Sequence, residues 1–117
     1  MVEDDAEVRA ILVAKLVGTL GPAYEVRAVG DGAEALRIIA DEAPLLVVTD
    51  LGLPELGGLE LCRRLRANPF TRATPIIAIS GDHLDAEARA AGCDAFLTKP
   101  LRLAELATLV HRYLPPR

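Results

Sequence analysis

The sequence has few of the features that mark secreted and membrane-spanning proteins. It contains two cysteines, Cys62 and Cys93, without CxxC or Cys/His ligand spacing, so we expect reduced, packed thiols rather than a disulfide framework or a zinc site. Its apolar runs, such as residues 45–48, are far shorter than the roughly 20 residues of a membrane helix, and no basic segment precedes a signal-like core. We therefore expect a soluble, cytoplasmic protein with no membrane partner.

An excess of positive charge is also absent. Thirteen Lys and Arg residues stand against 17 Asp and Glu residues, the net charge is −4, and no Lys/Arg stripe interrupts this balance. The electrostatic footprint of a nucleic-acid-binding protein is therefore missing. Apolar residues make up 51% of the 117 residues, which is enough to form a core and argues against disorder. We expect one domain over residues 1–117, with any output module outside it.

Two kinds of apolar spacing alternate along the chain. Short apolar or alternating runs predict strands at residues 24–29, 45–49, 75–80 and 95–98. Helical spacing predicts helices at residues 8–20, 33–39, 59–65, 84–91 and 103–114. End signals support these helices: Asp4 or Asp5 before the first, Asp31 in a D-x-x-E capping box before the second, Gly92 after the fourth, and Pro115-Pro116 after the last.

Strands that alternate with helices predict an α/β fold with a parallel sheet covered by helices on both faces. In such sheets the ligand site lies beyond the carboxyl ends of the strands. The polar residues expected there are Glu3, Asp4, Asp50, Ser80 and Lys99. The sequence therefore places its candidate functional residues at one edge of the sheet.

These residue types suit phosphoryl transfer to a carboxylate. Three converging carboxylates repel one another unless a cation neutralises them, and Mg²⁺ suits oxygen ligands that include one or two carboxylates and phosphate oxygens. Asp50 is the expected nucleophile, because it follows a buried strand and precedes a Gly-rich turn. Lys99 would offer positive charge to the phosphoryl oxygens and Ser80 a hydroxyl donor.

Each residue also has a purely structural interpretation. Glu3, Asp4 and Asp5 could form a charge cluster that favours a helix N-terminus, and an isolated Asp, Ser or Lys-Pro after a strand is more often a turn residue. The joint occurrence of the required residue types at separate strand ends favours the chemical interpretation.

At this point the chain resembles the receiver domains of two-component response regulators over nearly its whole length. The resemblance rests on VEDD at residues 2–5 with Arg9 downstream, VTDLGLP at 48–54 followed by GLEL at 58–61, PIIAISG at 75–81, and GCDAFLTKP at 92–100. It implies a flavodoxin-like (CheY-like) doubly wound parallel sheet with strand order 2-1-3-4-5.

The resemblance also implies functions for particular residues. Mg²⁺ would be held by Glu3, Asp4, Asp50 and the backbone carbonyl of Gly52. Asp50 would be the phosphoacceptor for a sensor histidine kinase or a histidine phosphotransfer protein. Ser80 and Lys99 would bind the phosphoryl group. Ser80 and Phe96 would switch conformation to signal to a downstream output domain or protein, although Phe96 could equally be a core aromatic. Lys99-Pro100 would be a cis peptide.

The sequence departs from the family pattern at its first strand and in its fourth helix. Only Met1-Val2 precede Glu3, so most of the central strand 1 is missing, and the segment between Ser80 and Lys99 is about one helical turn short. An unpaired centre would expose ladder groups on both neighbouring strands and leave a cavity beneath the first and last helices. We therefore expect either apolar residues before Met1, or a homodimer that exchanges a segment to fill the slot.

Three other functions compete with a phosphoryl-accepting switch, which would not be a turnover enzyme. A phosphorylation-independent receiver-like interaction module agrees with the short first strand but not with the intact Asp50, Ser80 and Lys99. A hydrolase of the aspartate-nucleophile type needs an acid two residues after the nucleophile, where this chain has Gly52. A flavin-binding protein is disfavoured because no aromatic residue lies in the expected loops.

Overall fold

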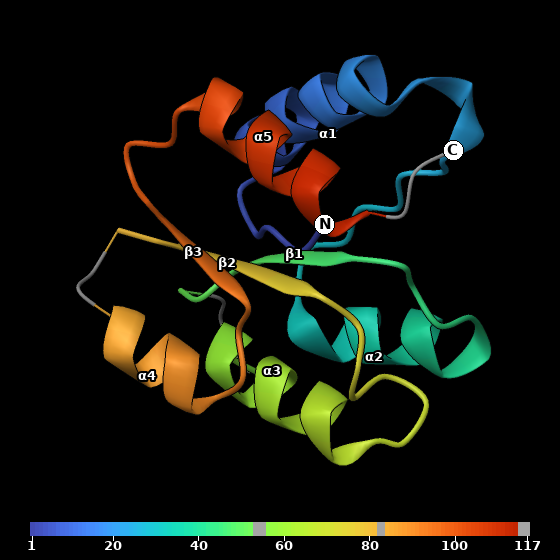
Figure 1. Cartoon of the computed structure of the whole chain (residues 1–117), viewed down its shortest axis with the longest axis vertical. Coiled ribbons are helices and arrows are strands. Elements are labelled where there is room, and N and C mark those ends of the chain that lie inside the picture. The colour runs from blue at the N-terminus through green and yellow to red at the C-terminus, as the bar shows by residue number, and fades with distance from the viewer. Residues whose placement is uncertain (53–55, 82–83, 115–117) are drawn as a thin grey trace.

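The computed structural model describes residues 1–52, 56–81 and 84–114 and consists of a parallel sheet between two layers of helices. Helices α1 and α5 cover one face, and α2, α3 and α4 cover the other (Figure 1). The elements are α1 (Ala6–Leu20), the 3-10 turn η1 (Gly21–Ala23), α2 (Gly32–Asp41), β1 (Val47–Asp50), α3 (Gly58–Ala67), β2 (Ile76–Ser80), α4 (Asp85–Ala90), β3 (Ala95–Thr98) and α5 (Leu103–Tyr113). The predicted α/β fold is confirmed.

The three named strands lie in the order β1-β2-β3, and both pairs are parallel. Val47 pairs with Ile76 in the first ladder, and Ile77 pairs with Ala95 in the second. All residues of β1 and β2 are buried, because helices cover both faces of these apolar segments. The carboxyl ends of β1, β2 and β3 therefore meet at one edge.

The N-terminal residues occupy the centre of the wider sheet without forming a strand. Val2 makes isolated parallel bridges to Val29 and to Thr49. Val2 N donates to the Val48 carbonyl at 2.8 Å, and Glu3 N donates to the Val29 carbonyl at 3.1 Å. The spatial order is thus the Val29 segment, the Val2 segment, β1, β2 and β3, which matches the predicted order 2-1-3-4-5.

The predicted strand at residues 24–29 is wrong except at its last residue. Only Val29 is bridged, and the preceding residues have no strand assignment. The alternating pattern is present, but a strand needs a partner for its ladder, and the neighbouring central segment extends only from Met1 to Glu3. The short central segment therefore offers the residues before Val29 no ladder partner.

A cavity of about 280 Å³ lies where strand 1 would continue toward its amino end. Its lining includes apolar side chains from both helix layers and from the segments that flank the missing strand: Leu16, Val26, Ile38, Leu46, Val110 and Leu114. This agrees with the expectation of a cavity beneath α1 and α5. The expectation that preceding residues or a second copy fill the slot stays a prediction.

Helix ends follow the predicted capping residues where these are described. Asp5 caps α1 by accepting hydrogen bonds from Glu7 N and Val8 N, and Asp31 caps α2 by accepting from Glu34 N. Gly92 has φ +101°, which suits the turn after the short α4. The predicted stop at Pro115-Pro116 and the Leu53-Pro54 part of the second motif lie outside the described residues. Among the described helices, none is long and apolar enough to cross a bilayer.

Candidate phosphoryl-transfer site

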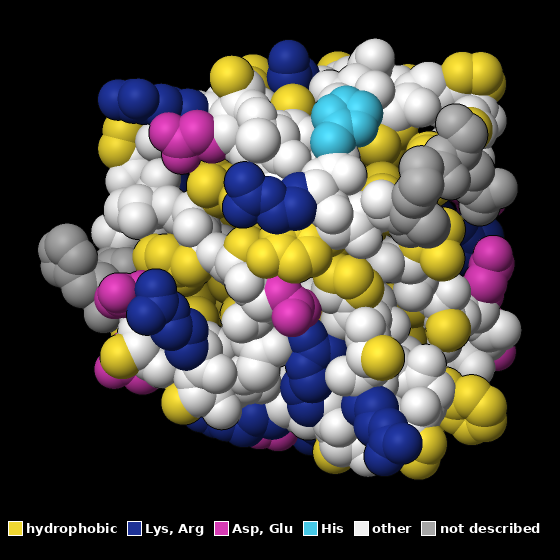
Figure 2. Space-filling model, viewed as in Figure 1, with side chains coloured by type: hydrophobic (Ala, Val, Ile, Leu, Met, Phe, Trp, Pro, Cys, Tyr) yellow, Lys and Arg dark blue, Asp and Glu magenta, His cyan; other side chains and the backbone are white. Residues whose placement is uncertain are grey.

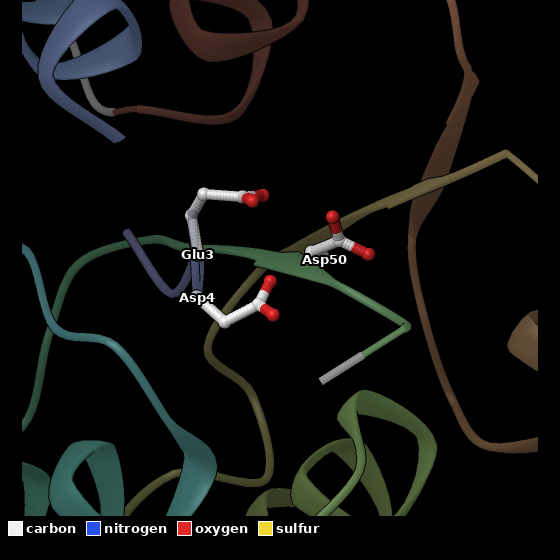
Figure 3. A group of neighbouring side chains, drawn as sticks. All are labelled: Glu3, Asp4 and Asp50. Atoms are coloured by element: carbon white, nitrogen blue, oxygen red, sulfur yellow. The ribbon is translucent and has the colours of Figure 1, made fainter. Parts of the chain in front are cut away.

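Three carboxylates from two segments meet at the carboxyl edge of the sheet. Glu3 and Asp4 follow the bridge at Val2, and Asp50 is the last residue of β1. In Figure 3 the Glu3 and Asp4 side chains extend toward the space beside Asp50. One oxygen of each carboxylate lies within 4.8 Å of the others. The structure thus brings together the acidic residues that the sequence predicted to converge.

Two of the three acidic side chains are buried. Glu3 is 2% exposed and Asp50 is 3% exposed, whereas Asp4 is exposed. Glu3 Oε1 accepts a hydrogen bond from Asp5 N at 3.2 Å. Among the buried polar side-chain atoms of the described residues, Glu3 Oε2 is the one without a hydrogen-bond partner. A buried carboxylate oxygen with no donor is costly, so this atom calls for a cation or a proton.

The two buried acids have pKa values shifted in opposite directions. Burial raises the pKa of Glu3 to about 7, and the neighbouring Asp50 carboxylate adds to that rise. Burial, the largest single influence, raises the pKa of Asp50 as well, but the hydrogen bonds from Lys99 and the Gly52 N–H, the neighbouring Glu3 and the charge of Lys99 together outweigh it and lower that pKa below its ordinary value. At neutral pH Asp50 is therefore ionised, while Glu3 lies near its midpoint.

Lys99 supplies the positive charge of the site. Its Nζ contacts Asp50 Oδ2 in an ion pair, and this hydrogen bond raises the pKa of the Lys99 ammonium. The backbone also positions it, because Lys99 N donates to the carbonyl of Ser80 at 2.8 Å. The Lys99-Pro100 peptide is cis, which confirms that expectation. Ser80 ends β2 and is 2% exposed, so both predicted phosphoryl-binding residues lie at this edge.

The donor set fits a hard divalent cation. Carboxylate oxygens are the ligands that Mg²⁺ accepts, and a cation beside Glu3 Oε2 would satisfy the unpartnered atom. Gly52 contributes a different contact from the one implied by resemblance: its N–H donates to Asp50 Oδ1 at 2.7 Å. Residues 53–55, which follow it, lie outside the described residues. The assignment of the Gly52 carbonyl to a metal therefore stays a prediction.

Phe96 lies apart from the acidic cluster. It belongs to β3, is partly buried, and packs against a small apolar group formed by Leu51, Ala78 and Ala88. Leu51 directly follows Asp50, so this group connects Phe96 with the carboxyl edge of β1. The geometry agrees both with a switch residue and with an ordinary core aromatic, the two interpretations that the sequence left open.

Two contacts that position the backbone of the site were not predicted from the sequence. Arg9 NH1 donates to the carbonyl of Glu3 at 2.8 Å, which fixes the backbone beneath the acidic pair. A Cβ on Gly58 would lie 2.4 Å from the carbonyl oxygen of Asp50, so α3 begins against the backbone that carries the nucleophile. The only sequence signals were an Arg one helical turn after the acidic residues and a glycine in the second motif.

The raised pKa of Glu3 makes stability depend on pH. Its pKa of about 7 in the folded chain exceeds the ordinary 4.5, so the unfolded chain releases this proton first as pH rises. The contribution of Glu3 to stability should decline between these two values and stay low above them. Adding Mg²⁺, which binds the ionised form, should raise the melting temperature at pH 8 and much less at pH 5.

Glu3→Gln is the control for this prediction, because it removes the titration and keeps the shape. Thermal melts of both proteins across pH 4 to 8 should show the decline in the wild type alone, as a difference between the two curves. Identical pH profiles for the wild type and the variant would contradict the assignment to Glu3.

Comparison with known proteins places this arrangement in a family. The profile of the "Response regulator receiver domain" family matches residues 1–111. The chain belongs to this family. The receiver domain also resembles a "Hybrid signal transduction histidine kinase G" of Dictyostelium discoideum, with 32% identity over 98% of this chain but only 4% of that protein. The "Polar-differentiation response regulator DivK" of Brucella anthropi is 29% identical over 97% of this chain and 94% of that protein.

Solved structures agree with the fold. A putative response regulator from Chloroflexus aurantiacus is 34% identical with a TM-score of 0.88, covering 96% of this chain and 92% of the other. The receiver domain of sensor histidine kinase PA1611 from Pseudomonas aeruginosa, solved with a magnesium ion coordinated in its active site cleft, is 30% identical with a TM-score of 0.84, covering 96% and 92%. The predicted CheY-like fold is confirmed, and the receiver domain belongs to two-component signalling.

Proposed function

We propose that this receiver domain is a phosphoryl-accepting switch in which Asp50 takes a phosphoryl group from a phosphohistidine donor. The observation that carries the proposal is the environment of Asp50. Its carboxylate is 3% exposed, lies with Glu3 and Asp4 in one acidic cluster, and is paired with Lys99. A nucleophile, a cation-binding oxygen set and a positive charge thus meet at one point.

The residues around Asp50 each have a role in this proposal. An oxygen of Asp50 attacks the phosphorus atom, and the imidazole of the donor leaves. Lys99 Nζ, which contacts the Asp50 carboxylate before transfer, would move its contact to the phosphoryl oxygens. Glu3, Asp4, Asp50 and the Gly52 carbonyl would hold Mg²⁺, which when bound offsets the negative charge of the carboxylates and the phosphoryl oxygens.

Signal output would pass from the phosphoryl group to β2 and β3. Ser80 ends β2, and its carbonyl accepts from Lys99 N, so the hydroxyl-bearing residue and the cation are linked through the backbone. We infer that the Ser80 hydroxyl moves toward the phosphoryl oxygens and that Phe96 turns inward. This inference is supported by the packing of Phe96 against Leu51, which follows Asp50, and against Ala78, which lies in β2.

The partners that fit this function are a sensor histidine kinase or histidine phosphotransfer protein upstream and an output domain or protein downstream. Basic and acidic side chains are interspersed on the face seen in Figure 2, which supports the prediction that nucleic acid is not a direct partner. A signalling switch reacts once per phosphorylation and is not a turnover enzyme on external substrates, although it can lose its own phosphate. Four further points stay predictions: a cytoplasmic location, the absence of a membrane partner, a single domain over residues 1–117, and homodimer formation.

The decisive experiment is incubation with acetyl phosphate and Mg²⁺ followed by intact-mass measurement. We expect one labile phosphate adduct that requires the metal. A folded protein that gains no phosphate under these conditions would contradict the switch and favour the phosphorylation-independent interaction module.

Lys99→Ala should separate metal binding from phosphoryl transfer. The ammonium contacts Asp50 and acts on phosphoryl oxygens, so its removal should slow phosphate uptake by about tenfold or more while Mg²⁺ affinity changes little. Calorimetric Mg²⁺ titration and intact-mass time courses measure the two quantities on the same preparation. The comparison variant is Lys15→Ala, which removes a lysine of α1 away from the site and should behave like the wild type. Equal uptake rates in all three proteins would exclude a role for Lys99 in transfer.

A further inference from the structure

The two cysteines, which are 31 residues apart in the sequence, are in contact in the structure. Cys62 lies in α3, and Cys93 lies in the turn between α4 and β3. Their sulfur atoms are 3.2 Å apart, and both are free thiols. A side-chain shift of about 1 Å would bring them to the roughly 2 Å separation of an S–S bond. The expected packed thiols are therefore a pair.

The two thiols differ in their access to solvent. Cys62 is fully buried in the apolar cluster on the α2 and α3 side of the sheet, which also includes Leu65 and Ile76. Cys93 is half-buried and packs at the margin of the same cluster. A small oxidant would therefore meet Cys93 first, and the sulfur directly behind Cys93 is that of Cys62.

Arg66 holds Cys93 in this position. It lies one turn after Cys62 on α3, and its Nε donates to the carbonyl of Gly92 at 2.9 Å. Its remaining nitrogens donate to the Thr74 carbonyl at 2.6 Å and to Asp94 Oδ2 at 2.7 Å. The residues before and after Cys93 are thus both bound to the helix that carries Cys62.

The same surroundings favour the thiolate at Cys93. The hydrogen bond with Cys62 lowers the pKa of Cys93, and the nearby Arg66 guanidinium acts in the same direction, although burial opposes them. The pKa of Cys62 is raised by that hydrogen bond and by burial. Cys93 is thus the thiol that reacts with an oxidant, and Cys62 is the thiol that resolves the product.

We propose that Cys62 and Cys93 form a reversible redox pair, which hydrogen peroxide converts into an intrachain disulfide. The Cys93 thiolate attacks one peroxide oxygen, the O–O bond breaks, and Cys93 becomes a sulfenic acid while the released hydroxide takes a proton to form water. The Cys62 sulfur then attacks the Cys93 sulfur. The S–S bond forms, the S–O bond breaks, and a second water leaves with the Cys62 proton. Two thiols are oxidised and one peroxide is reduced.

The crosslink would fasten α3 to the turn that leads into β3. Cys93 and Phe96 both pack against the apolar group formed by Leu51, Ala78 and Ala88, so the restraint would extend toward the strand that carries the proposed switch residue. The thiol chemistry itself does not require phosphorylation. The Asp50→Asn variant should therefore form the same disulfide, which keeps failure of this proposal distinct from failure of the proposed function.

The test uses the complete chain, fully reduced and then treated with a small excess of hydrogen peroxide under native conditions. We expect a mass lower by two hydrogen atoms, no thiol left for N-ethylmaleimide, and a crosslink between tryptic peptides 38–63 and 90–102 that dithiothreitol reverses. Closing a loop of this length should raise the melting temperature by on the order of 10 °C.

Cys62→Ala and Cys93→Ser are the matched controls, and each should lose the crosslink and the rise in melting temperature. In Cys62→Ala, peroxide should add oxygen to Cys93 instead. The wild-type result stands alone if either variant fails to fold. Two alkylatable thiols after treatment of folded wild type, oxygen addition without a disulfide, or crosslinks only between chains would each overturn the proposal.

Discussion

Asp50→Asn should abolish phosphate uptake from acetyl phosphate in the presence of Mg²⁺. The amide that replaces the carboxylate is not a nucleophile, and its oxygen is a weaker ligand for a hard cation than a charged one. Asp50 is buried and its pKa is held below its ordinary value, so its carboxylate is ionised for attack at neutral pH. Intact-mass measurement should detect no adduct in the variant.

The matched control for this prediction is Asp41→Asn. Asp41 is an exposed residue at the end of α2, so the same chemical change there should leave phosphate uptake at the wild-type level. Thermal melts of all three proteins should show cooperative unfolding, so that a missing adduct reflects lost chemistry rather than lost structure. An adduct of wild-type extent in Asp50→Asn would show that another residue accepts the phosphate.

An apolar extension before Met1, such as Ile-Leu-Val-Val, should raise the melting temperature by roughly 10 °C or more. The added residues would form ladder hydrogen bonds, each of which contributes about 0.5–1.5 kcal/mol, and their side chains would fill the cavity. The slot is the cavity of about 280 Å³ beside Val26 and Leu46. The Met1 amino group donates a hydrogen bond to the Arg27 carbonyl, and desolvation lowers the pKa of this amino group to about 6. An extension would replace this desolvated amino group with an uncharged peptide N–H and would move the charged terminus away from it.

A Ser-Gly-Ser-Gly extension is the control for length, because it can pair but has no side chains to fill the cavity. We expect it to raise the melting temperature far less than the apolar extension. Light scattering should accompany both melts, since a dimer of the unextended chain would fill the slot by exchange. Equal melting temperatures for the unextended and the apolar-extended chains, with both monomeric, would contradict the argument.

The parts of the fold that depend on local pattern were predictable from the sequence. The run predicted at residues 75–80 became β2, which begins one residue later at Ile76 and ends at Ser80 as predicted, because a short apolar segment between turns is buried whichever neighbours it has. Asp31 caps α2 as its spacing predicted. The strand at residues 24–29 failed because its ladder depends on a partner that lies elsewhere in the chain and is short. Periodicity within a segment carries no information about that partner.

The candidate site shows the same division. Asp50 and Lys99 were predicted to meet because parallel strands bring their carboxyl ends together, and they form an ion pair. The hydrogen bond from Arg9 to the Glu3 carbonyl and the contact between the cysteine thiols were not predicted. Both depend on how a helix is rotated against its neighbours, which no spacing rule for metal or disulfide motifs describes.

The segments of the sheet are paired to different extents, which determines where the sheet opens first. Ile76–Ser80 is buried throughout and paired on both sides, whereas Val2 joins its neighbours through isolated bridges. Fluctuations that expose backbone amides to solvent should therefore begin at the Val2 side, and the amides of β2 should exchange with deuterium last. Because Glu3 and Asp4 follow Val2, each such opening also disperses the acidic cluster. The acidic cluster therefore persists only as long as the isolated Val2 bridges stay formed, however stable β2 is.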